Sequence, residues 1–387
     1  MKYSWFRIGG IKLLVTMPHN WAFGHLALEI LMAFALANRE KATVYFIERS
    51  RVVNRALFRL KSDAVKTLPR TRWIAWIIRT VWSIRHVLMP TMRSDLEPGN
   101  SKQVEADNQS EPYFRRLLIR DPVPVHLSQK DQLEAARQAA NVGIFEGTKI
   151  VTLHVREAGF RSRPGRPEDR SMSTRNARIE SYDKAIDFLL EQGYFIVRIG
   201  DSTMTPLNRN GVLDLAKSDK RTELLELYCL MKSDFLLGCE SGLLGVSYLI
   251  NLPFLSVNAT DPVSSYPIRH DGLYILKRVM DRKSENVLSL ADMLKEDYLF
   301  NLRNLDRYEY IDNTSEEILE VTKEMVERLK AKPQPNRAQL EYKELISATV
   351  EDLKQRWDYI KKWGSEDGFL GDGWIGRDFA ERNLYAG

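Results

Sequence analysis

The residues best suited to chemistry are His154 and Arg156, a His-x-Arg pair that follows the apolar run 149–153. That run predicts a buried strand. In an open α/β sheet, ligands bind in the crevice at the carboxyl ends of the strands. The guanidinium of Arg156 presents a planar fork of donors that fits phosphate or carboxylate oxygens. The pair therefore indicates an anion site, and the alternative is an arginine that forms a salt bridge at a domain interface.

Two further predicted strands, at 194–200 and 235–238, also end in small or polar residues. These residues are Gly200, Asp201, Glu240, Ser241 and Gly242. A helix is predicted over 243–250, and the free N–H groups at its start favour phosphate oxygens. Taken alone, a serine in the position of Ser241 is more often a helix N-cap than a phosphate ligand.

A similar turn occurs in the first half of the chain. A strand at 11–16, a helix at 25–37 and a strand at 43–47 predict the opening of a Rossmann-like domain. Gly24 and His25 stand where the first loop meets the helix. A glycine there lets a ligand approach the backbone, although a plain turn glycine has the same signature.

Helices and short apolar strands alternate from residue 131 to residue 257. Crossover helices between consecutive strands predict a parallel, doubly wound sheet. With 387 residues the chain is longer than one hydrophobic core usually covers, so we expect two domains. We place them at 1–145 and 146–330, with C-terminal helices and a tail at 331–387.

Composition narrows the class of protein further. The chain is 44% hydrophobic and 28% charged, which is typical of a folded globular protein. Its only cysteines, Cys229 and Cys239, give no disulfide framework and no metal-ligand cluster, so we expect a reducing compartment, the cytoplasm. No run of about 18 uncharged apolar residues predicts a transmembrane helix, and the start of the chain lacks the pattern of a signal peptide.

Basic residues are concentrated between positions 49 and 94, where Asp63 is the single acid. Within this region the segment 70–89 is rich in tryptophan. One prediction is a helix that lies in the headgroup layer of an anionic membrane, so that the protein is peripheral at the inner face of the cytoplasmic membrane. The alternative is a helix that packs on a sheet through one stripe. This stripe consists of Trp73, Trp76, Ile77, Thr80, Ile84 and Val87. No nucleic-acid-binding motif accompanies these cations, so we do not expect a nucleic acid partner.

Several motifs occur together and in a fixed order along the chain. They are Gly24–Glu29, His154–Phe160, Arg175-Asn176-Ala177 with Ile179, Val197–Asp201 followed by Met204-Thr205-Pro206, and Ser241-Gly242. On these motifs, roughly residues 10 to 330 of the chain resemble a family of bacterial glycosyltransferases from surface-polysaccharide gene clusters. The chain is more distantly similar to fucosyltransferase-like enzymes.

The resemblance implies an α/β fold of the GT-B type, in which two Rossmann-like, doubly wound domains face a central cleft. It also implies a nucleotide-sugar donor, held mostly by the second domain, and a glycan or lipid-linked acceptor. The implied donor-binding residues are Gly24, His25, His154, Arg156, Asn176, Gly200, Asp201, Glu240, Ser241 and Gly242. Two features depart from the family: Glu240 stands where a smaller polar residue is expected, and the arginine-rich stretch after His154 is longer than the family needs.

The reaction itself sets further requirements. Transfer from a sugar diphosphate builds negative charge on the leaving phosphate, which Arg156 would neutralise. If the reaction inverts, the acceptor hydroxyl needs a base, and the candidates are Glu29, Glu157 and Asp201. We therefore name Arg156, Glu157 and Asp201 as the predicted catalytic residues. The alternatives are that Asp201 holds the ribose or an adjacent loop and that Glu157 pairs with a neighbouring arginine. Because GT-B enzymes typically work without a divalent metal and no Asp-x-Asp motif appears between the domains, we expect neither a metal nor a cofactor.

Two other functions fit the same pattern of strands and polar residues. A non-catalytic protein that binds a nucleotide or a polysaccharide would use the same crevice without turnover. A nucleotide-sugar epimerase would release a changed nucleotide sugar in the absence of any acceptor.

The C-terminal part of the chain predicts helices over 314–329 and 337–363. Thr314 and Glu317 form a capping-box pattern at the start of the first helix. The tail that follows either crosses back to the first domain or stacks its aromatic rings on sugars. Those aromatic residues are Phe369, Trp374, Phe379 and Tyr385.

Overall fold

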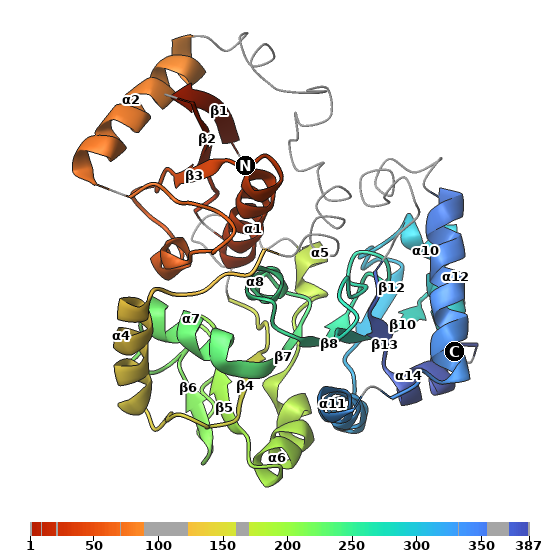
Figure 1. The fold of residues 1–387 in the computed structure, drawn as a ribbon. Coiled ribbons are helices and arrows are strands. Elements are labelled where there is room, and N and C mark those ends of the chain that lie inside the picture. Colours follow the sequence, from red (N-terminus) through yellow and green to blue (C-terminus); the bar gives the residue numbers. More distant parts are fainter. Residues whose placement is uncertain are drawn as a thin grey trace.

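A computed structural model describes residues 2–8, 10–20, 22–69, 71–88, 123–159, 170–331, 333–353 and 371–385. They form a first unit, residues 2–88, and a large unit, residues 123–385 (Figure 1). Part of the arginine-rich stretch after His154 and Phe369 of the tail lie outside the described residues.

A seven-stranded sheet forms the centre of the large unit. The strand order is β13-β9-β8-β7-β4-β5-β6, and every pair of neighbours is parallel. The strands are β4 (Ile150–His154), β5 (Phe195–Arg198), β6 (Val212–Asp214), β7 (Ser233–Cys239), β8 (Phe254–Ala259), β9 (Leu273–Leu276) and β13 (Trp374–Ile375). The predicted parallel sheet is thus confirmed for the second half of the chain.

Helices cover both faces of this sheet. α4, α7 and α8 share a hydrophobic cluster with one face, whereas α6 and α11 share a second cluster with the opposite face. Their bounds are α4 (Gln129–Ala140), α6 (Asp183–Glu191), α7 (Glu223–Lys232), α8 (Leu243–Ile250) and α11 (Ser315–Lys330). Along β4 the side chains alternate between the clusters, with Ile150 in the first and Val151 in the second. The sheet is therefore doubly wound.

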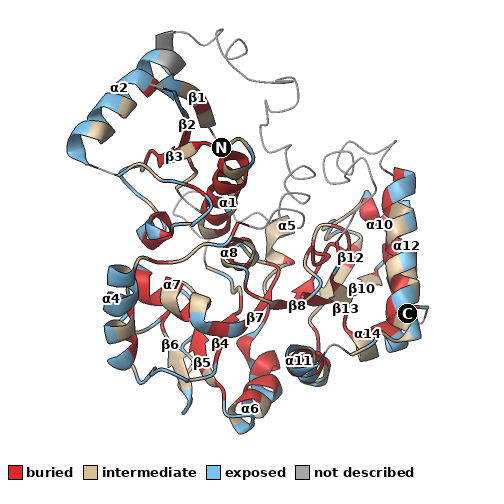
Figure 2. Cartoon of the chain, viewed as in Figure 1, coloured by how far each residue is buried: buried red, intermediate tan, exposed pale blue. Residues whose placement is uncertain are grey.

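A small antiparallel sheet and several short helices complete the large unit (Figure 2). They are α5 (Arg170–Ser173), η4 (Ile179–Tyr182), β10 (Arg278–Asp281), β11 (Asn286–Val287), α9 (Leu290–Met293), α10 (Glu296–Leu299) and β12 (Tyr308–Ile311). At the start of α11 the predicted capping box is confirmed. The Glu317 N–H donates to the Thr314 hydroxyl over 3.2 Å, and the Thr314 N–H donates to the Glu317 carboxylate over 2.8 Å.

The first unit contains a three-stranded sheet in the order β1-β2-β3. β2 (Ile11–Met17), α1 (Phe23–Arg39) and β3 (Thr43–Phe46) form the predicted β-α-β opening, with β2 and β3 parallel. β1 (Lys2–Ile8), which the sequence did not predict, pairs antiparallel with β2. Over the described residues the first unit therefore has a small mixed sheet, in which β2 and β3 are parallel and β1 is antiparallel.

Two segments lie elsewhere than expected. α4, which falls within the range assigned to the first domain, packs against α7 of the large unit. The C-terminal tail does not cross back to the first domain over its described residues, because β13 pairs with β9 at the edge of the large sheet. Phe379 of α14 (Arg377–Asn383) is buried there, beside α12 (Arg337–Leu353). The tail therefore completes the large unit.

The tryptophan-rich segment forms the helix α2 (Arg72–Leu88) on the sheet of the first unit. If α2 packed on the sheet through the predicted stripe, Trp73 and Trp76 would be buried. They are exposed instead, and Trp82 on the opposite face of the helix is buried. Of the helices that the structure describes, none has the length and apolar character to cross a membrane.

The two units meet where α1 packs against α8, and their side chains share one hydrophobic cluster. The short helix η1 (Arg55–Arg59) of the first unit also contacts α7. Next to η1, the Asn54 side chain donates to the Glu223 carbonyl over 3.2 Å. The first unit is thus held against the sheet of the large unit.

Candidate active site

The carboxyl ends of β4, β5 and β7 lie side by side, because these parallel strands are neighbours in the sheet. His154 is the last residue of β4 and is in register with Gly238 of β7. Arg198 ends β5, and Cys239 ends β7. The polar residues that follow these strands are therefore brought to one edge, as the sequence analysis expected.

His154 is buried at this edge. Its Nδ1 lies 2.9 Å from the carbonyl oxygen of Ile199, so Nδ1 carries the proton and Nε2 carries the lone pair. Burial lowers the pKa of His154, with the cations Arg198 and Arg156 adding to the effect, while the Ile199 carbonyl opposes it. His154 is therefore a neutral hydrogen-bonding residue at neutral pH.

Arg156 and Asn176, which the sequence analysis places in separate motifs, are in direct contact. The Nε of Arg156 donates to the Asn176 side-chain oxygen over 2.9 Å. The backbone carbonyl of Asn176 accepts a bond of 2.6 Å from the Lys277 ammonium, which also pairs with Asp312 at 2.6 Å. The half-buried guanidinium is thus aligned by an amide that is itself anchored.

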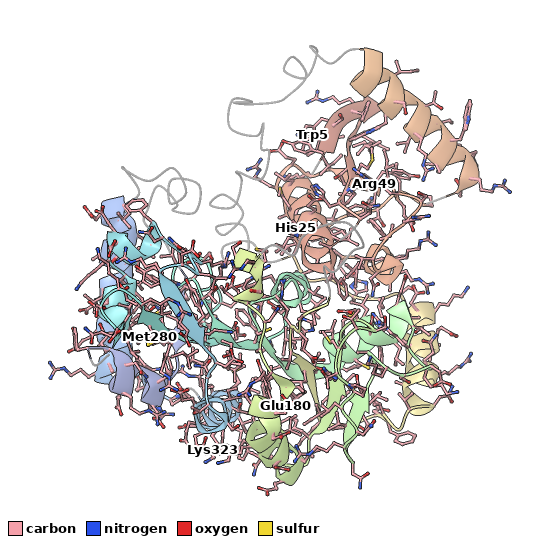
Figure 3. All side chains as sticks on the ribbon, turned by 180° about the vertical axis from the view of Figure 1, so that it is seen from behind. Trp5, His25, Arg49, Glu180, Met280 and Lys323 are labelled. Atoms are coloured by element: carbon pink, nitrogen blue, oxygen red, sulfur yellow. The ribbon has the colours of Figure 1, made fainter. Side chains whose placement is uncertain are left out.

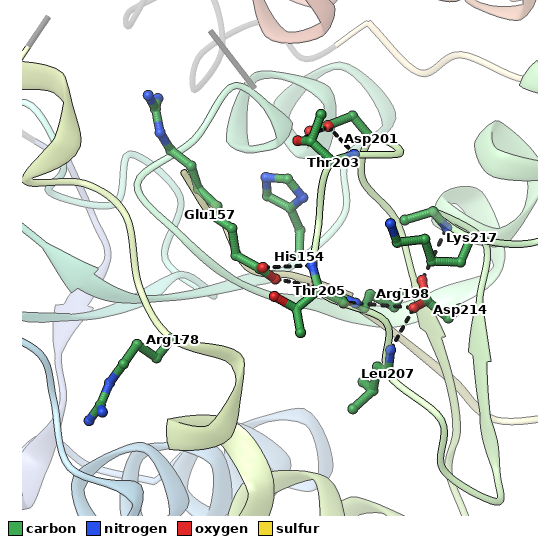
Figure 4. A network of polar contacts seen from close by, with 12 residues as sticks. His154, Glu157, Arg178, Arg198, Asp201, Thr203, Thr205, Leu207, Asp214 and Lys217 are labelled. Carbon is green, nitrogen blue, oxygen red and sulfur yellow. Dashed lines mark hydrogen bonds and ion pairs between the residues drawn. The ribbon is translucent and has the colours of Figure 1, made fainter. Parts of the chain in front are cut away.

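Glu157 is bound into a buried ion network below the edge. One carboxylate oxygen pairs with Arg198, and the other accepts a bond of 2.7 Å from the Thr205 N–H. Arg198 is fully buried and also pairs with Asp214 at 3.1 Å. Figure 4 shows the Glu157 carboxylate directed at Arg198 and Thr205. These contacts give Glu157 a structural role and occupy both of the oxygens that a catalytic base would use.

Gly200 and Asp201 form the turn after β5. The Asp201 carboxylate accepts a bond of 2.8 Å from the Thr203 N–H and a second from the Thr203 hydroxyl. A Cβ placed on Gly200 would overlap the sulfur of Met204, so the glycine lets this buried side chain pack under the turn. The contacts that the structure gives for Gly200 and Asp201 are therefore within the loop after β5 and stabilise its conformation.

Glu240 is a buried carboxylate that is fully engaged. One oxygen accepts from the Thr260 N–H and hydroxyl, at 2.9 and 2.7 Å. The other pairs with Arg303 and lies 3.8 Å from Arg175. These arginines explain why a glutamate can occupy a position where the resemblance predicts a smaller polar residue. Beside it, the Ser241 hydroxyl accepts a hydrogen bond of 3.3 Å from the N–H of Leu243, the first residue of α8, whose N-cap is Gly242.

Gly24 and Gly242 lie at a close approach of the two units. A Cβ on Gly24 would overlap the backbone of Gly242, and one on Gly245 would lie 2.8 Å from the Gly24 carbonyl oxygen. The described contact of Gly24 is therefore with the start of α8. This packing brings His25, the exposed next residue, to the junction of the units (Figure 3).

A histidine–carboxylate pair that the sequence analysis missed lies in the loop before α1. Nδ1 of His19 contacts one oxygen of Glu29, and the His19 backbone N–H donates to the other over 2.6 Å. Glu29 is buried, and the ring of His25 stands edge-on to the ring of His19, with their centroids 6.3 Å apart. A carboxylate on Nδ1 fixes the proton there and leaves the lone pair on Nε2, which is the arrangement of a general base. The only sequence signal was the carboxylate, Glu29.

Both cysteines are free and buried. Burial raises the pKa of Cys239 to about 11 and that of Cys229 to about 12, so neither thiol ionises at neutral pH. Cys239 accepts a bond of 3.1 Å from the Arg156 N–H. It therefore helps to fix the backbone of the His-x-Arg pair.

Comparison with known proteins gives only distant similarity. No family model and no curated protein matches the chain. Among solved structures, the chain is similar to the E. coli ADP-heptose LPS heptosyltransferase II, at 12% identity and a TM-score of 0.40, over 63% of this chain and 84% of the other. A glycosyl transferase family 9 protein from Veillonella parvula matches at 12% identity and a TM-score of 0.38, over 63% and 80%. The NodZ α-1,6-fucosyltransferase soaked with GDP-fucose matches at 13% identity and a TM-score of 0.31, over 64% and 94%. At these TM-scores the function has to be argued from the site.

Proposed function

We propose that the protein is a glycosyltransferase that moves a sugar from a nucleotide-diphosphate donor to a glycan or lipid-linked acceptor in surface-polysaccharide synthesis. The observation that supports this most is the bond between Arg156 and Asn176 at the carboxyl edge of a parallel sheet. The sequence motifs that contain these two residues support the same family. The proposal places the reaction in the cytoplasm, because the chain has two free thiols and no disulfide.

In this proposal Arg156 binds the diphosphate of the donor. Because Asn176 aligns the guanidinium before the donor arrives, little reorganisation is needed as charge develops on the leaving group. The proposed transfer needs no divalent metal, since the arginine supplies the positive charge. His154 contributes a neutral Nε2, which accepts a hydrogen bond from a hydroxyl group of the nucleotide sugar.

For an inverting transfer, we propose His19 as the base. Its Nε2 takes the proton of the acceptor hydroxyl while the acceptor oxygen bonds to the anomeric carbon. The bond from that carbon to the diphosphate breaks, and the nucleoside diphosphate leaves with the electron pair. Glu29 stabilises the imidazolium that forms. Glu157 and Asp201 are weaker candidates, because their carboxylates accept bonds from Thr205 and Thr203.

The first test is a thermal-shift screen with nucleoside diphosphates and nucleotide sugars. ADP-heptose and GDP-fucose, which are named for solved relatives, are reasonable starting compounds. A ligand at a hundred times its Kd adds about 2.7 kcal/mol of stability, which such a screen detects. We expect Arg156→Ala to remove this shift and to abolish transfer.

Arg209→Ala is the control, since Arg209 forms an ion pair with Asp183 on α6 and has no place in the proposed site. Unchanged diphosphate affinity in Arg156→Ala would contradict the assigned role. Binding without turnover for any acceptor would instead indicate a non-catalytic protein. A changed nucleotide sugar released without acceptor would indicate an epimerase.

A further inference from the structure

α2 has two apolar faces, and only one of them packs against the first unit. Ile74, Ile78 and Trp82 follow one another at helical spacing and lie on the sheet. They join a cluster that includes Leu13, Val15, Tyr45 and Ile47. The inner face of the helix is therefore accounted for.

The outer face carries five large apolar side chains that are exposed. Trp73 and Trp76 are 64% and 70% exposed, and they are followed by Ile77, Val81 and Ile84 at 44%, 43% and 46%. Successive residues of a helix are separated by about 100°, so these five occupy one continuous face. A contiguous exposed patch of this kind marks an interaction surface.

Cations lie on this helix and in a loop beside it. In residues 49–84, of which the structure describes all but 70, Asp63 is the only acid. Arg72 and Arg79 lie on α2 itself, and Arg49 and Arg51 lie in the loop beside it, whereas Arg55 and Arg59 belong to η1, which contacts the large unit. Arg79 donates to the Glu48 carbonyl over 2.6 Å, which holds α2 beside the loop that bears Arg49 and Arg51. The apolar patch thus has positive charge on its own helix, from Arg72 and Arg79, and in the neighbouring loop, from Arg49 and Arg51.

We propose that this outer face of α2 docks onto an anionic phospholipid membrane. The tryptophan rings enter the headgroup layer, where amphipathic aromatic side chains are most stable, and the surrounding cations bind lipid phosphates. α2 lies on the side of the first unit away from the large sheet (Figure 1), so the docked protein keeps the large unit in water. This inference goes beyond the proposed transferase activity and does not depend on it.

The test is flotation of the full chain with vesicles of phosphatidylcholine, with and without phosphatidylglycerol. We expect the chain to float with the anionic vesicles and to be released by high salt. The double variant Trp73→Gln, Trp76→Gln is expected to bind on the order of ten-fold more weakly. The matched control is Phe145→Gln, since Phe145 is 65% exposed but lies in the large unit. It should bind as the wild type does.

Several outcomes would overturn the proposal. These are failure of the wild type to float with either vesicle, equal flotation of the tryptophan variant, and equal flotation with neutral vesicles. Light scattering without lipid provides one more test. A dimer that becomes a monomer in the tryptophan variant would assign this face to a second copy of the chain. Both variants change exposed side chains, so unchanged melting temperatures show that folding is intact.

Discussion

The carboxylate of Glu29 contacts both the Nδ1 and the backbone N–H of His19, although ten positions separate the two residues. Two contacts from one carboxylate fix the position of the loop and the orientation of the ring together. The pair is carried by the first unit, whereas Arg156 is carried by the large unit. In the proposed reaction, one unit therefore supplies the base and the other stabilises the leaving group.

Replacement of His19 tests this division. We expect His19→Asn to slow transfer by about 10²- to 10⁴-fold, which is the usual contribution of a general base. Donor affinity should stay at the wild-type value, because His19 does not contact the diphosphate in the proposed arrangement. Single-turnover rates and nucleotide titrations separate the two effects. Glu29→Gln should slow transfer less, because the imidazole of His19 is still present. Parallel loss of donor binding in His19→Asn would instead point to a structural role.

Asn176 is expected to act through Arg156 as a positioning residue. Loss of a hydrogen bond to a charged group costs about 1.5–3 kcal/mol, so Asn176→Ala should weaken diphosphate binding by roughly 10- to 100-fold. Binding of the nucleoside without phosphates should not change. Calorimetry on the two ligands distinguishes this from general misfolding, which would weaken both. In a double variant with Arg156→Ala, the effects should not add, because both remove the same interaction.

Glu157 is expected to matter for stability more than for chemistry. Glu157→Gln removes the charge that pairs with the buried Arg198, and we expect a loss of about 1–3 kcal/mol, since Asp214 still pairs with that arginine. Chemical denaturation measures the loss. Below the melting temperature, the transfer rate should remain within a few-fold of wild type. A loss of several orders of magnitude with normal stability would restore Glu157 as a catalytic residue.

The buried state of His154 predicts a pH dependence of stability. Burial lowers the pKa of His154 in the folded protein below the ordinary value of 6.5, so His154 binds its proton more tightly in the unfolded chain. The contribution of His154 to the free energy of unfolding is therefore fully present above about pH 6.5. As the pH falls below that value, the free energy of unfolding decreases by up to about 1.4 kcal/mol per pH unit, until the pH reaches the pKa of His154 in the folded protein. Denaturation of wild type and His154→Gln between pH 7.5 and 5 measures the difference. Parallel curves over that range would contradict the prediction.

The sequence predicted the elements with strong patterns. The apolar run before His154 formed β4, and the alternation of strands and helices became a parallel sheet, because buried strands need continuous apolar residues. The pattern of α2 was ambiguous, since both of its faces are apolar and only the sheet decides which one is buried. β13 is two residues long, too short to show any period.

The site was predictable to a similar extent. The strand ends placed His154 and Arg156 correctly at the edge, because their positions follow from the strand itself. The His19–Glu29 pair depends on how a loop folds back onto a helix, which no spacing rule describes. An arginine was one predicted partner of Glu157, but the sequence did not identify Arg198, nor Arg303 as the partner of Glu240, since both arginines reach the carboxylates only through the tertiary fold.

The shared cluster between α1 and α8 has a consequence for engineering. Ile30 of the first unit and Val246 of the large unit belong to the same core, and Gly24 rests on Gly242. The first unit is therefore not an exchangeable module. A chimera that takes this unit from another protein would need a matching α8 surface, because any side chain larger than glycine at Gly24 would push the two helices apart.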